Sequence, residues 1–326
     1  MEQTPGNRVL VIAEVGFNHG GDMNLASEMI RVAAAAGADC VKFQSYSAEG
    51  LVLRRVSHFD AIKVGELTTE DHLHLARTAE SHGIEFLSTP YDERQVDLLE
   101  QVGVARYKVA SMDVTNLPFL RYVGSVGKPV ILSTGMANLG EIERAVEVMR
   151  SVGDIQVTLL HCVSRYPAEP GQVNLRTIEQ LESAFGLPVG YSDHTLGNAT
   201  ALAAVALGAV VIEKHFTLDS SAEGADHSIS AEPRQLGQLV TDIRDIRDSL
   251  GCWSASDRRV DRAQARLNRR GLFARIDIRA GTEITADMLK CVRPEEGLKP
   301  EYLQVVIGRR AKTDIGAEEP ITFDVI

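Results

Sequence analysis

The chain has 326 residues, of which 44% are hydrophobic and 24% charged, and these ordinary values exclude collagen-like, coiled-coil and wholly disordered proteins. At roughly 100–200 residues per domain, this length fits one large domain followed by a small one. With 34 Lys and Arg against 45 Asp and Glu, the formal net charge is −11, so we expect neither nucleic acid nor a membrane surface as a partner. An anionic ligand would need a local basic pocket.

The cysteines and the apolar segments predict a cytoplasmic protein. The four cysteines, Cys40, Cys162, Cys252 and Cys291, show no CxxC spacing, so we expect free thiols and neither a zinc ribbon nor disulfides. The first residues, MEQTPGNR, contain no apolar core of a signal peptide. The Ala-rich run at residues 199–212 is shorter than the ~18 apolar residues of a membrane span.

Short apolar, β-branched runs alternate with longer segments of helical period over the first 250 residues. The predicted strands are residues 9–13, 40–43, 85–88, 107–110, 130–132, 157–161, 189–191 and 209–213. The clearest helical segments are residues 24–36, 70–82, 95–102, 139–150, 175–185 and 235–250. Eight such units within about 250 residues predict a (β/α)8 barrel of the TIM type, with an open doubly wound sheet as the alternative. No GxGxxG motif follows the first strand, which argues against a dinucleotide-binding sheet.

We place the barrel in residues 1–251, a linker in residues 252–270 and a small β-rich module in residues 271–326. The linker contains the polar, Arg-rich stretch SASDRRVDRAQARLNRR, which we expect to be partly helical. The module has short strand-like runs with frequent Gly and Pro, and it is near the lower size limit of an independent domain. We therefore expect it to pack on another surface.

Polar side chains occur at or just after every predicted strand of the barrel. The carboxyl ends of barrel strands and the loops after them build the active face, so the pattern predicts one pocket. Two lysines, Lys42 and Lys108, interrupt strands that are otherwise apolar. A buried charge is costly unless it is paired, so they predict either a bound phosphate or carboxylate or ion pairs with barrel acids. Hydroxyl groups that could bind the same anion are those of Thr89, Ser111, Ser133 and Ser192.

Two histidines, His194 and His215, follow adjacent strands and are expected on the same rim. Neutral imidazoles together with a carboxylate suit a divalent first-row metal such as Mn²⁺. Glu14 and Asp113 could supply that carboxylate or act in acid–base catalysis. Residues 218–233, after the last strand, form a long segment that we expect to contact substrate. We expect the remaining histidines of the helices and loops at the surface, namely His58, His72, His74 and His82.

With these residues in place, the chain resembles the sialic acid synthase family, the phosphoenolpyruvate-dependent nonulosonic acid synthases. The stretches that carry the resemblance are IAEVGFNHGG (12–21), VKFQ (41–44), FLSTP (86–90), YKVASMD (107–113), ILSTGM (131–136), LHCVSRYP (160–167), GYSDHT (190–195) and IEKHFTLD (212–219). The C-terminal residues are similar to that family's antifreeze-like (SAF) module, at RRGLFARIDIRAGTEIT (269–285) and VRP (292–294).

The resemblance implies a role for each matching residue. The residues that would hold phosphoenolpyruvate are Lys42, Thr89, Lys108, Ser111, Ser133 and Ser192. His194 and His215 would bind the metal, which we expect to be Mn²⁺, with Mg²⁺ or Co²⁺ as alternatives. Glu14 would lie near the reacting centre, and Tyr166 and Asp226 would contact the sugar. Arg293 would reach the site of a neighbouring subunit in a domain-swapped homodimer, and Asp113 stands where the family often has a glutamate.

The expected reaction is a transfer that condenses phosphoenolpyruvate with an N-acylated amino-hexose such as N-acetylmannosamine, giving a nine-carbon 2-keto sugar acid and phosphate. The alternatives are a related synthase of the legionaminic or pseudaminic type, or one that makes a 9-phosphate product. A Schiff-base aldolase that uses Lys108 would need neither metal nor phosphate release. Synthases of seven- or eight-carbon keto acids share the chemistry but lack the small C-terminal module. A non-catalytic barrel would make the clustering of polar groups a coincidence.

Overall fold

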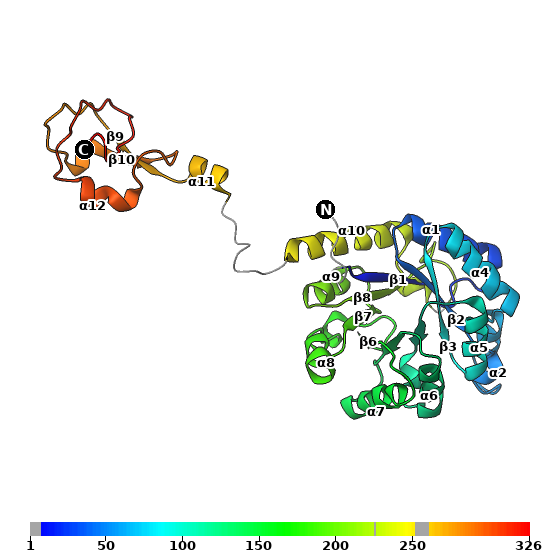
Figure 1. Ribbon diagram of the computed structural model, residues 1–326. Helices are drawn as coiled ribbons and strands as arrows, with labels where there is room; N and C mark the ends of the chain where they lie inside the picture. Colours follow the sequence, from blue (N-terminus) through cyan, green and yellow to red (C-terminus); the bar gives the residue numbers. More distant parts are fainter. Residues whose placement is uncertain (1–7, 225, 252–260) are drawn as a thin grey trace. The chain divides into compact units, whose positions relative to one another are not determined.

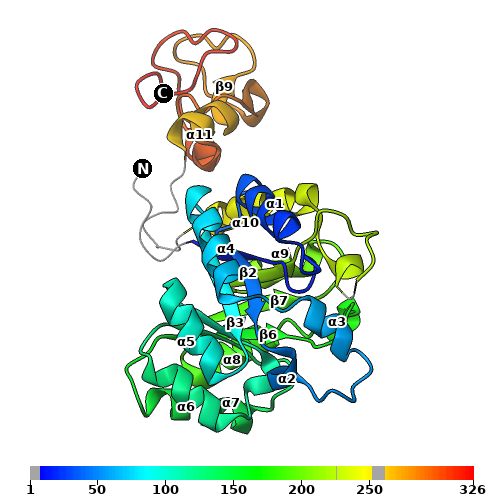
Figure 2. The same cartoon turned by 90° about the vertical axis from the view of Figure 1, so that its right-hand side faces the viewer.

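The computed structural model describes residues 8–224, 226–251 and 261–326 of the chain. It divides into two compact units, Met1–Gly251 and Cys252–Ile326. In the first unit, eight parallel strands are surrounded by helices, as both views show (Figures 1 and 2). None of the helices in the described ranges is long and apolar enough to cross a membrane.

The strands form one sheet in the order β3-β2-β1-β8-β7-β6-β5-β4, and β3 also contacts β4, so the sheet curves round into a barrel. Their bounds are β1 Leu10–Glu14, β2 Cys40–Ser45, β3 Glu85–Pro90, β4 Tyr107–Val109, β5 Val130–Ser133, β6 Val157–Cys162, β7 Val189–Asp193 and β8 Val211–His215. The predicted (β/α)8 barrel is therefore confirmed, and the open doubly wound sheet is excluded. Most strands extend one or two residues beyond the predicted ends, into the polar residues that follow the apolar runs.

The helices that cover the barrel are α1 Met23–Ala35, α4 Thr69–Ser81, α5 Glu93–Val102, α6 Leu117–Ser125, α7 Leu139–Arg150, α8 Thr177–Phe185, α9 Ala199–Ala206 and α10 Pro233–Leu250. Two short helices, α2 (Ala48–Leu51) and α3 (Phe59–Val64), lie between β2 and α4. Local signals fix the ends of several helices. At the start of α4, Thr68 Oγ1 accepts a hydrogen bond from Asp71 N at 3.2 Å, and Asp71 Oδ2 accepts one from Thr68 N at 2.9 Å. Helix α5 ends at Gly103, whose φ of 84° favours glycine.

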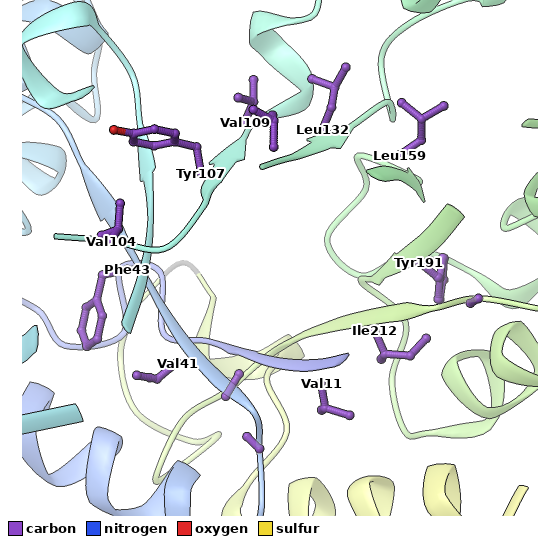
Figure 3. Close-up of a cluster of buried hydrophobic side chains, with 14 of the residues drawn as sticks. Val11, Val41, Phe43, Val104, Tyr107, Val109, Leu132, Leu159, Tyr191 and Ile212 are labelled. Atoms are coloured by element: carbon purple, nitrogen blue, oxygen red, sulfur yellow. The ribbon is translucent and has the colours of Figure 1, made fainter. Parts of the chain in front are cut away.

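Side chains alternate along each strand, and the two faces have different partners. Outward residues such as Val11, Phe43 and Ile212 pack against the helices in the main hydrophobic core (Figure 3). Inward residues form a second, smaller cluster that fills the barrel interior: Ile12, Cys40, Leu87, Ile131, Leu160 and Val211. This cluster is the floor beneath the polar residues described below.

One sequence expectation about the histidines is wrong. His72 is fully buried in α4 rather than exposed, on the outer side of the sheet. Its Nδ1 lies 2.8 Å from the carbonyl oxygen of Thr68, and its Nε2 lies 2.7 Å from Ser45 Oγ. Both ring nitrogens have partners, which makes burial of the imidazole tolerable.

The second unit has its own hydrophobic core, formed by residues such as Leu272, Ile284 and Ile315. It contains α11 (Arg262–Asn268), the antiparallel strands β9 (Gly271–Ala274) and β10 (Leu289–Val292), and α12 (Leu303–Val306). Helix α11 lies in the predicted linker, and residues 252–260 of that linker fall outside the described residues.

Candidate active site

On five of the strands, the inward face changes from apolar to polar within two residues. Ile12 is followed by Glu14, Cys40 by Lys42, Leu87 by Thr89, Ile131 by Ser133, and Val211 by Glu213 and then His215. Because residues i and i+2 share a face of a strand, these polar side chains stand directly above the apolar floor. Together they line a cleft of about 430 Å³ at the carboxyl ends of the strands. Its lining residues are Glu14, Phe17, Lys42, Gln44, Thr89, Tyr91, Lys108, Ala110, Ser111, Met112, Ser133, Met136, Cys162, Ser164, Tyr166, Ser192, His194, Glu213, His215 and Asp226.

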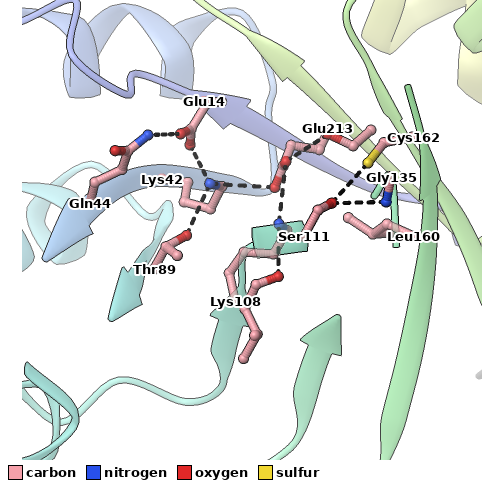
Figure 4. A network of polar contacts seen from close by, with 12 residues as sticks. Glu14, Lys42, Gln44, Thr89, Lys108, Ser111, Gly135, Leu160, Cys162 and Glu213 are labelled. Carbon is pink, nitrogen blue, oxygen red and sulfur yellow. Dashed lines mark hydrogen bonds and ion pairs between the residues drawn. The ribbon is translucent and has the colours of Figure 1, made fainter. Parts of the chain in front are cut away.

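Two lysines and two glutamates form an ion-pair network at the base of this cleft (Figure 4). Lys42 Nζ lies 2.7 Å from Glu14 Oε2 and 3.6 Å from Glu213 Oε2. Lys108 Nζ lies 3.7 Å from Glu213 Oε1. All four side chains are buried. The ion pairs that the sequence left open as an alternative to a bound anion are thus present in the structure.

The two glutamates have opposite pKa shifts. Burial and the neighbouring charge of Glu213 raise the pKa of Glu14 to about 7, against the opposing effect of Lys42. Burial also disfavours ionisation of Glu213, but Lys108, Lys42 and a hydrogen bond from Ser192 outweigh it and lower its pKa to about 2. Near neutral pH one carboxylate is therefore fully ionised and the other only partly.

The hydroxyl groups surround the same network. Thr89 Oγ1 accepts a hydrogen bond from Lys42 Nζ at 3.2 Å, and Ser192 Oγ donates one to Glu213 Oε1 at 2.9 Å. Ser111 Oγ accepts one from the backbone N–H of Gly135 at 2.9 Å. The lysines and hydroxyls that the sequence proposed as an anion site are therefore brought together, with Ser133 also lining the cleft.

The histidine pair lies on the rim of the cleft next to this network. The ring centroids of His194 and His215 are 5.4 Å apart, and the ring of Tyr166 lies 4.2 Å from that of His194. Burial lowers the pKa of both histidines, so both are neutral near pH 7. His194 Nδ1 lies 2.8 Å from the carbonyl oxygen of Val163, which leaves Nε2 of that ring to accept a ligand.

The donor set of this rim fits a divalent metal in part. His215 Nδ1 is buried without a hydrogen-bond partner, and it lies 3.8 Å from Asp226 Oδ2. Neutral imidazoles with one acidic neighbour are ligands for first-row metals. In the described part of the chain, however, no three His, Cys, Asp or Glu side chains are already arranged to hold an ion. A metal here would take its remaining ligands from water or substrate.

Asp226 reaches the cleft from the long segment after β8, next to Gly16 in the segment after β1. Gly16 has a φ of 54°, and a Cβ at this position would lie 3.3 Å from Asp226 Oδ2 and 3.4 Å from Glu14 Oε1. A glycine therefore allows the close approach of the two carboxyl groups to this turn. Among the described residues of the predicted substrate segment, Asp226 alone lines the cleft.

Asp113 is the one predicted site residue of the first unit that does not line the cleft. Asp113 is absent from the lining, where its neighbour Met112 is found instead, and its Oδ1 accepts a hydrogen bond from Asn116 Nδ2 at 3.2 Å. Arg293 belongs to the second unit, where it is exposed and its Nη1 lies 3.4 Å from Asn268 Oδ1. The short turn after β4 thus directs Met112 rather than Asp113 into the cleft, and the catalytic role of Asp113 stays a prediction.

Several polar residues at the strand ends also lie outside the cleft. His161, Asp193 and Lys214 occupy alternate positions of their strands to those that face inward. His161 Nε2 lies 2.6 Å from the carbonyl oxygen of Val173, and Lys214 is paired with Asp193. The prediction that all strand-end polar groups converge on one pocket therefore holds for only one face of each strand.

Sequence analysis gave no role to Glu213, although this residue contacts both lysines of the network. Its signal was present, because Val211, Glu213 and His215 share one face of β8. The outer wall of the cleft was also missed, and it contains large, partly exposed side chains: Phe17, Tyr91, Met112 and Met136. No pattern in the sequence distinguishes these residues from surface positions.

The barrel and its cleft define a class of protein: a (β/α)8 enzyme whose active face combines buried lysines, hydroxyls and a neutral histidine pair. The chain belongs to the NeuB family, whose model matches residues 29–255, and residues 269–326 match the SAF domain. The expected family and C-terminal module are confirmed.

Three relatives show the extent of the similarity. The N,N'-diacetyllegionaminic acid synthase of Campylobacter jejuni is 40% identical over 330 residues, which cover 96% of this chain and 99% of that protein. Human N-acetylneuraminate-9-phosphate synthase is 33% identical, with 100% and 96% covered. The crystal structure of the N-acetylneuraminic acid (sialic acid) synthetase of Leptospira borgpetersenii in complex with citrate has a TM-score of 0.75 at 39% identity, covering 81% of this chain and 94% of that one. This chain is therefore a biosynthetic enzyme of the sialic acid synthase group.

Proposed function

We propose that the protein condenses phosphoenolpyruvate with an N-acylated amino-hexose such as N-acetylmannosamine, and so forms a nine-carbon 2-keto sugar acid and phosphate. The observation that carries this proposal is the cleft itself, in which two buried lysines lie beside two neutral histidines. An anion site next to a possible metal site is what a phosphorylated enol and a sugar aldehyde require together. The cytoplasmic location of the reaction remains a prediction.

In this proposal, phosphoenolpyruvate binds over the ion-pair network. Its negative charges would compete with Glu14 and Glu213 for the ammonium groups of Lys42 and Lys108. The hydroxyl groups would donate to the phosphate and carboxylate oxygens, and they are those of Thr89, Ser111, Ser133 and Ser192. The lysines thus position the enol and neutralise its charge without forming a covalent bond.

His194 and His215 would hold the divalent cation, for which we propose Mn²⁺, with Mg²⁺ or Co²⁺ as alternatives. When bound, such a cation polarises the carbonyl group of the open-chain sugar as a Lewis acid. Tyr166 packs on the His194 ring at the mouth of the cleft, and Asp226 lies beside His215. Both would contact the sugar hydroxyl and acylamino groups as these enter.

Glu14 would move the protons of the reaction. The methylene carbon of phosphoenolpyruvate forms a bond to the sugar aldehyde carbon, the C=O π pair moves to the aldehyde oxygen as an alkoxide, and positive charge is left on the enol carbon. Water adds there and gives a proton to Glu14, whose pKa of about 7 suits a base that works near neutral pH, and the alkoxide takes up one proton to become a hydroxyl. The hydroxyl of the tetrahedral carbon then loses its proton as the C–O bond to phosphate breaks; the departing phosphate takes that proton, and the keto group remains.

The outer wall of the cleft favours an alternative acceptor sugar for the same type of reaction. Met112 and Met136 are about half exposed there, 49% and 59%, and they offer apolar surface to the sugar. Among the described residues of the barrel itself, the cleft lining has no basic residue besides the two lysines and the two neutral histidines. A diacetamido sugar of the legionaminic or pseudaminic type would fit this wall better than a sugar 6-phosphate that leads to a 9-phosphate product. The 40% identity to a diacetyllegionaminic acid synthase supports the same acceptor class.

An aldolase that forms a Schiff base is the one competing reaction with a specific observation in its favour. Burial lowers the pKa of Lys108, as a nucleophilic lysine requires. Borohydride trapping separates the two reactions, because only the aldolase would form a covalent adduct of about substrate mass on Lys108. We expect no adduct.

The proposed quaternary structure is a domain-swapped homodimer in which Arg293 completes the site of a neighbouring subunit. The side chain of Arg293 is exposed within its own unit, as a residue that reaches another subunit would be. Mixing His215→Ala and Arg293→Ala subunits tests this directly. Mixed dimers should regain activity, because one of their two sites contains both native residues, whereas each variant alone should be inactive.

The test of the reaction is phosphate release from phosphoenolpyruvate with a panel of acceptors. The panel contains N-acetylmannosamine, its 6-phosphate and diacetamido sugars of the legionaminic and pseudaminic types. We expect release that needs both a divalent metal and one of these sugars, and His215→Ala should abolish it while the protein stays folded. Full turnover without metal would contradict the role given to the histidines.

A further inference from the structure

A second buried ion pair lies behind the histidine pair, outside the cleft. Asp193 of β7 and Lys214 of β8 are register partners, and Lys214 Nζ lies 2.8 Å from Asp193 Oδ2. The two side chains are 0% and 1% exposed. Each residue directly precedes a histidine of the cleft rim, His194 or His215. The pair is therefore one residue away from both proposed metal ligands.

Lys214 also holds the loop that follows β7. Its Nζ donates to the carbonyl oxygens of Thr195 and Gly197, at 2.5 and 2.9 Å, in addition to Asp193. These three acceptors use all three N–H groups of the ammonium. The loop that carries His194 is thus hydrogen-bonded to the ammonium group of Lys214. Lys214 belongs to β8, the strand that ends with His215.

Asp193 fixes the same loop from the other side. Its Oδ1 accepts hydrogen bonds from the backbone N–H and the hydroxyl of Thr195, at 2.9 and 2.8 Å. It also accepts hydrogen bonds from Tyr191 and Thr200, at 3.0 and 3.2 Å. The residue before His194, Asp193, therefore belongs to the ion pair, and the residue after it, Thr195, is hydrogen-bonded to that pair. The imidazole of His194 is oriented by the carbonyl oxygen of Val163.

We propose that Asp193 and Lys214 are positioning residues that set the spacing of His194 and His215 and thereby the affinity for the divalent cation. The proposal rests on the proposed function, in which these two histidines hold the metal. Neither Asp193 nor Lys214 lines the cleft, so neither touches substrate. They act by joining the two strand ends, so that the imidazoles are in place before the cation arrives.

The anion part of the cleft does not depend on this pair. One residue earlier, on the inward face, Ser192 Oγ donates to Glu213 Oε1 at 2.9 Å and joins the same two strands. Loss of the outer pair should therefore weaken the binding of the cation much more than the binding of phosphoenolpyruvate. A pair that only stabilised the fold would change neither affinity at temperatures where the protein is fully folded.

The test compares Lys214→Met with a core variant of no connection to the cleft, Leu99→Ala in α5. Both lower stability, but only the first removes the contacts to the loop. Mn²⁺ alone is titrated into the ligand-free full chain, and free Mn²⁺ is followed by electron paramagnetic resonance well below the unfolding temperature. Phosphoenolpyruvate is titrated separately by calorimetry without metal. We expect the Kd for Mn²⁺ to rise about 10–100-fold in Lys214→Met and to stay within about twofold of wild type in Leu99→Ala. The Kd for phosphoenolpyruvate should stay within about twofold in both.

Other outcomes overturn the proposal. Wild-type affinity for Mn²⁺ in folded Lys214→Met would show that the pair is only structural, and the proposed function would be untouched. An equal loss of affinity for Mn²⁺ and phosphoenolpyruvate would show a general collapse of the cleft. A wild-type chain that binds no Mn²⁺ would refute the metal part of the proposed function, and this inference with it. If Lys214→Met does not fold, Thr195→Val decides: it removes one hydroxyl from Asp193, and it should weaken Mn²⁺ binding about threefold or more, whereas an unchanged Kd refutes the proposal.

Discussion

The raised pKa of Glu14 predicts a specific pH dependence of stability. In the folded protein this pKa is about 7, against 4.5 for an unperturbed glutamate. A carboxyl group with a raised folded pKa binds more protons in the folded state, so its contribution to stability is present at low pH and is lost as pH rises toward 7. Between pH 5 and pH 8 the contribution of Glu14 to the free energy of unfolding should fall by about 2.5 kcal/mol.

The assay compares urea unfolding of the ligand-free wild type and Glu14→Gln at several pH values. Other titrating groups, including the buried histidines, are common to both proteins and cancel in the difference. The difference in unfolding free energy should therefore shift by about 2.5 kcal/mol across this range, with wild type losing stability relative to the variant as pH rises.

Glu213→Gln is a second variant of the same network, because Glu213 has a pKa of about 2 and its own contribution changes only below about pH 4.5. Its charge helps to raise the pKa of Glu14, so this variant should lose part of the fall in stability that wild type shows between pH 5 and pH 8. A flat difference for Glu14→Gln, within about 0.5 kcal/mol, would refute the assignment of the raised pKa to Glu14.

Three further substitutions test other parts of the structure. Lys42→Met leaves two buried carboxylates without this partner, so it should lower the free energy of unfolding by about 3–5 kcal/mol in urea denaturation; a loss below about 1 kcal/mol would contradict the buried network. Gly16→Ala forces a Cβ against Asp226 at a positive φ and should cost about 1–2 kcal/mol; an unchanged melting temperature would count against this turn. His72→Phe removes two buried hydrogen bonds and should lower the free energy of unfolding by about 1–3 kcal/mol in thermal unfolding, with KM for phosphoenolpyruvate unchanged. An unchanged free energy of unfolding would contradict the burial of His72.

The sequence predicted the barrel well because its strands carry an unusually regular signal. Buried parallel strands are short apolar runs. Glycines such as Gly103 after α5 and Gly186 after α8 end the helices between them. Helices α6 and α9 were not among the clearest segments, and α9, ATALAAVA, explains why: it is so uniformly apolar that it has no amphipathic stripe to recognise.

The sequence predicted which residue types form the site, but not which side of each strand their side chains occupy. Lys42, Lys108, His194 and His215 are chemically unusual for a strand end, so they were identified from sequence alone. Whether a strand-end residue points into the barrel depends on its parity along the strand, which is only certain once the register is known. Glu213 was therefore overlooked.

The direction of the Asp113 side chain could not be predicted for a related reason. Ser111–Asp113 form a single 3-10 turn, and a turn of this kind rotates successive side chains by about a third of a circle. The sequence shows that polar groups follow β4, but the direction of each side chain in the turn depends on packing. The apolar Met112 faces the cleft, and Asp113 is held by Asn116.

The most direct test of the account is the phosphorus NMR line width of phosphoenolpyruvate bound to the Mn²⁺-loaded protein. A paramagnetic ion broadens the resonance of a nucleus held close to it, so the signal reports whether the anion and the cation occupy the same cleft. We expect strong broadening in wild type, and sharp lines in His215→Ala at the same total Mn²⁺. Sharp lines in wild type with both ligands bound, or equal broadening in the variant, would contradict a shared site at the mouth of the barrel.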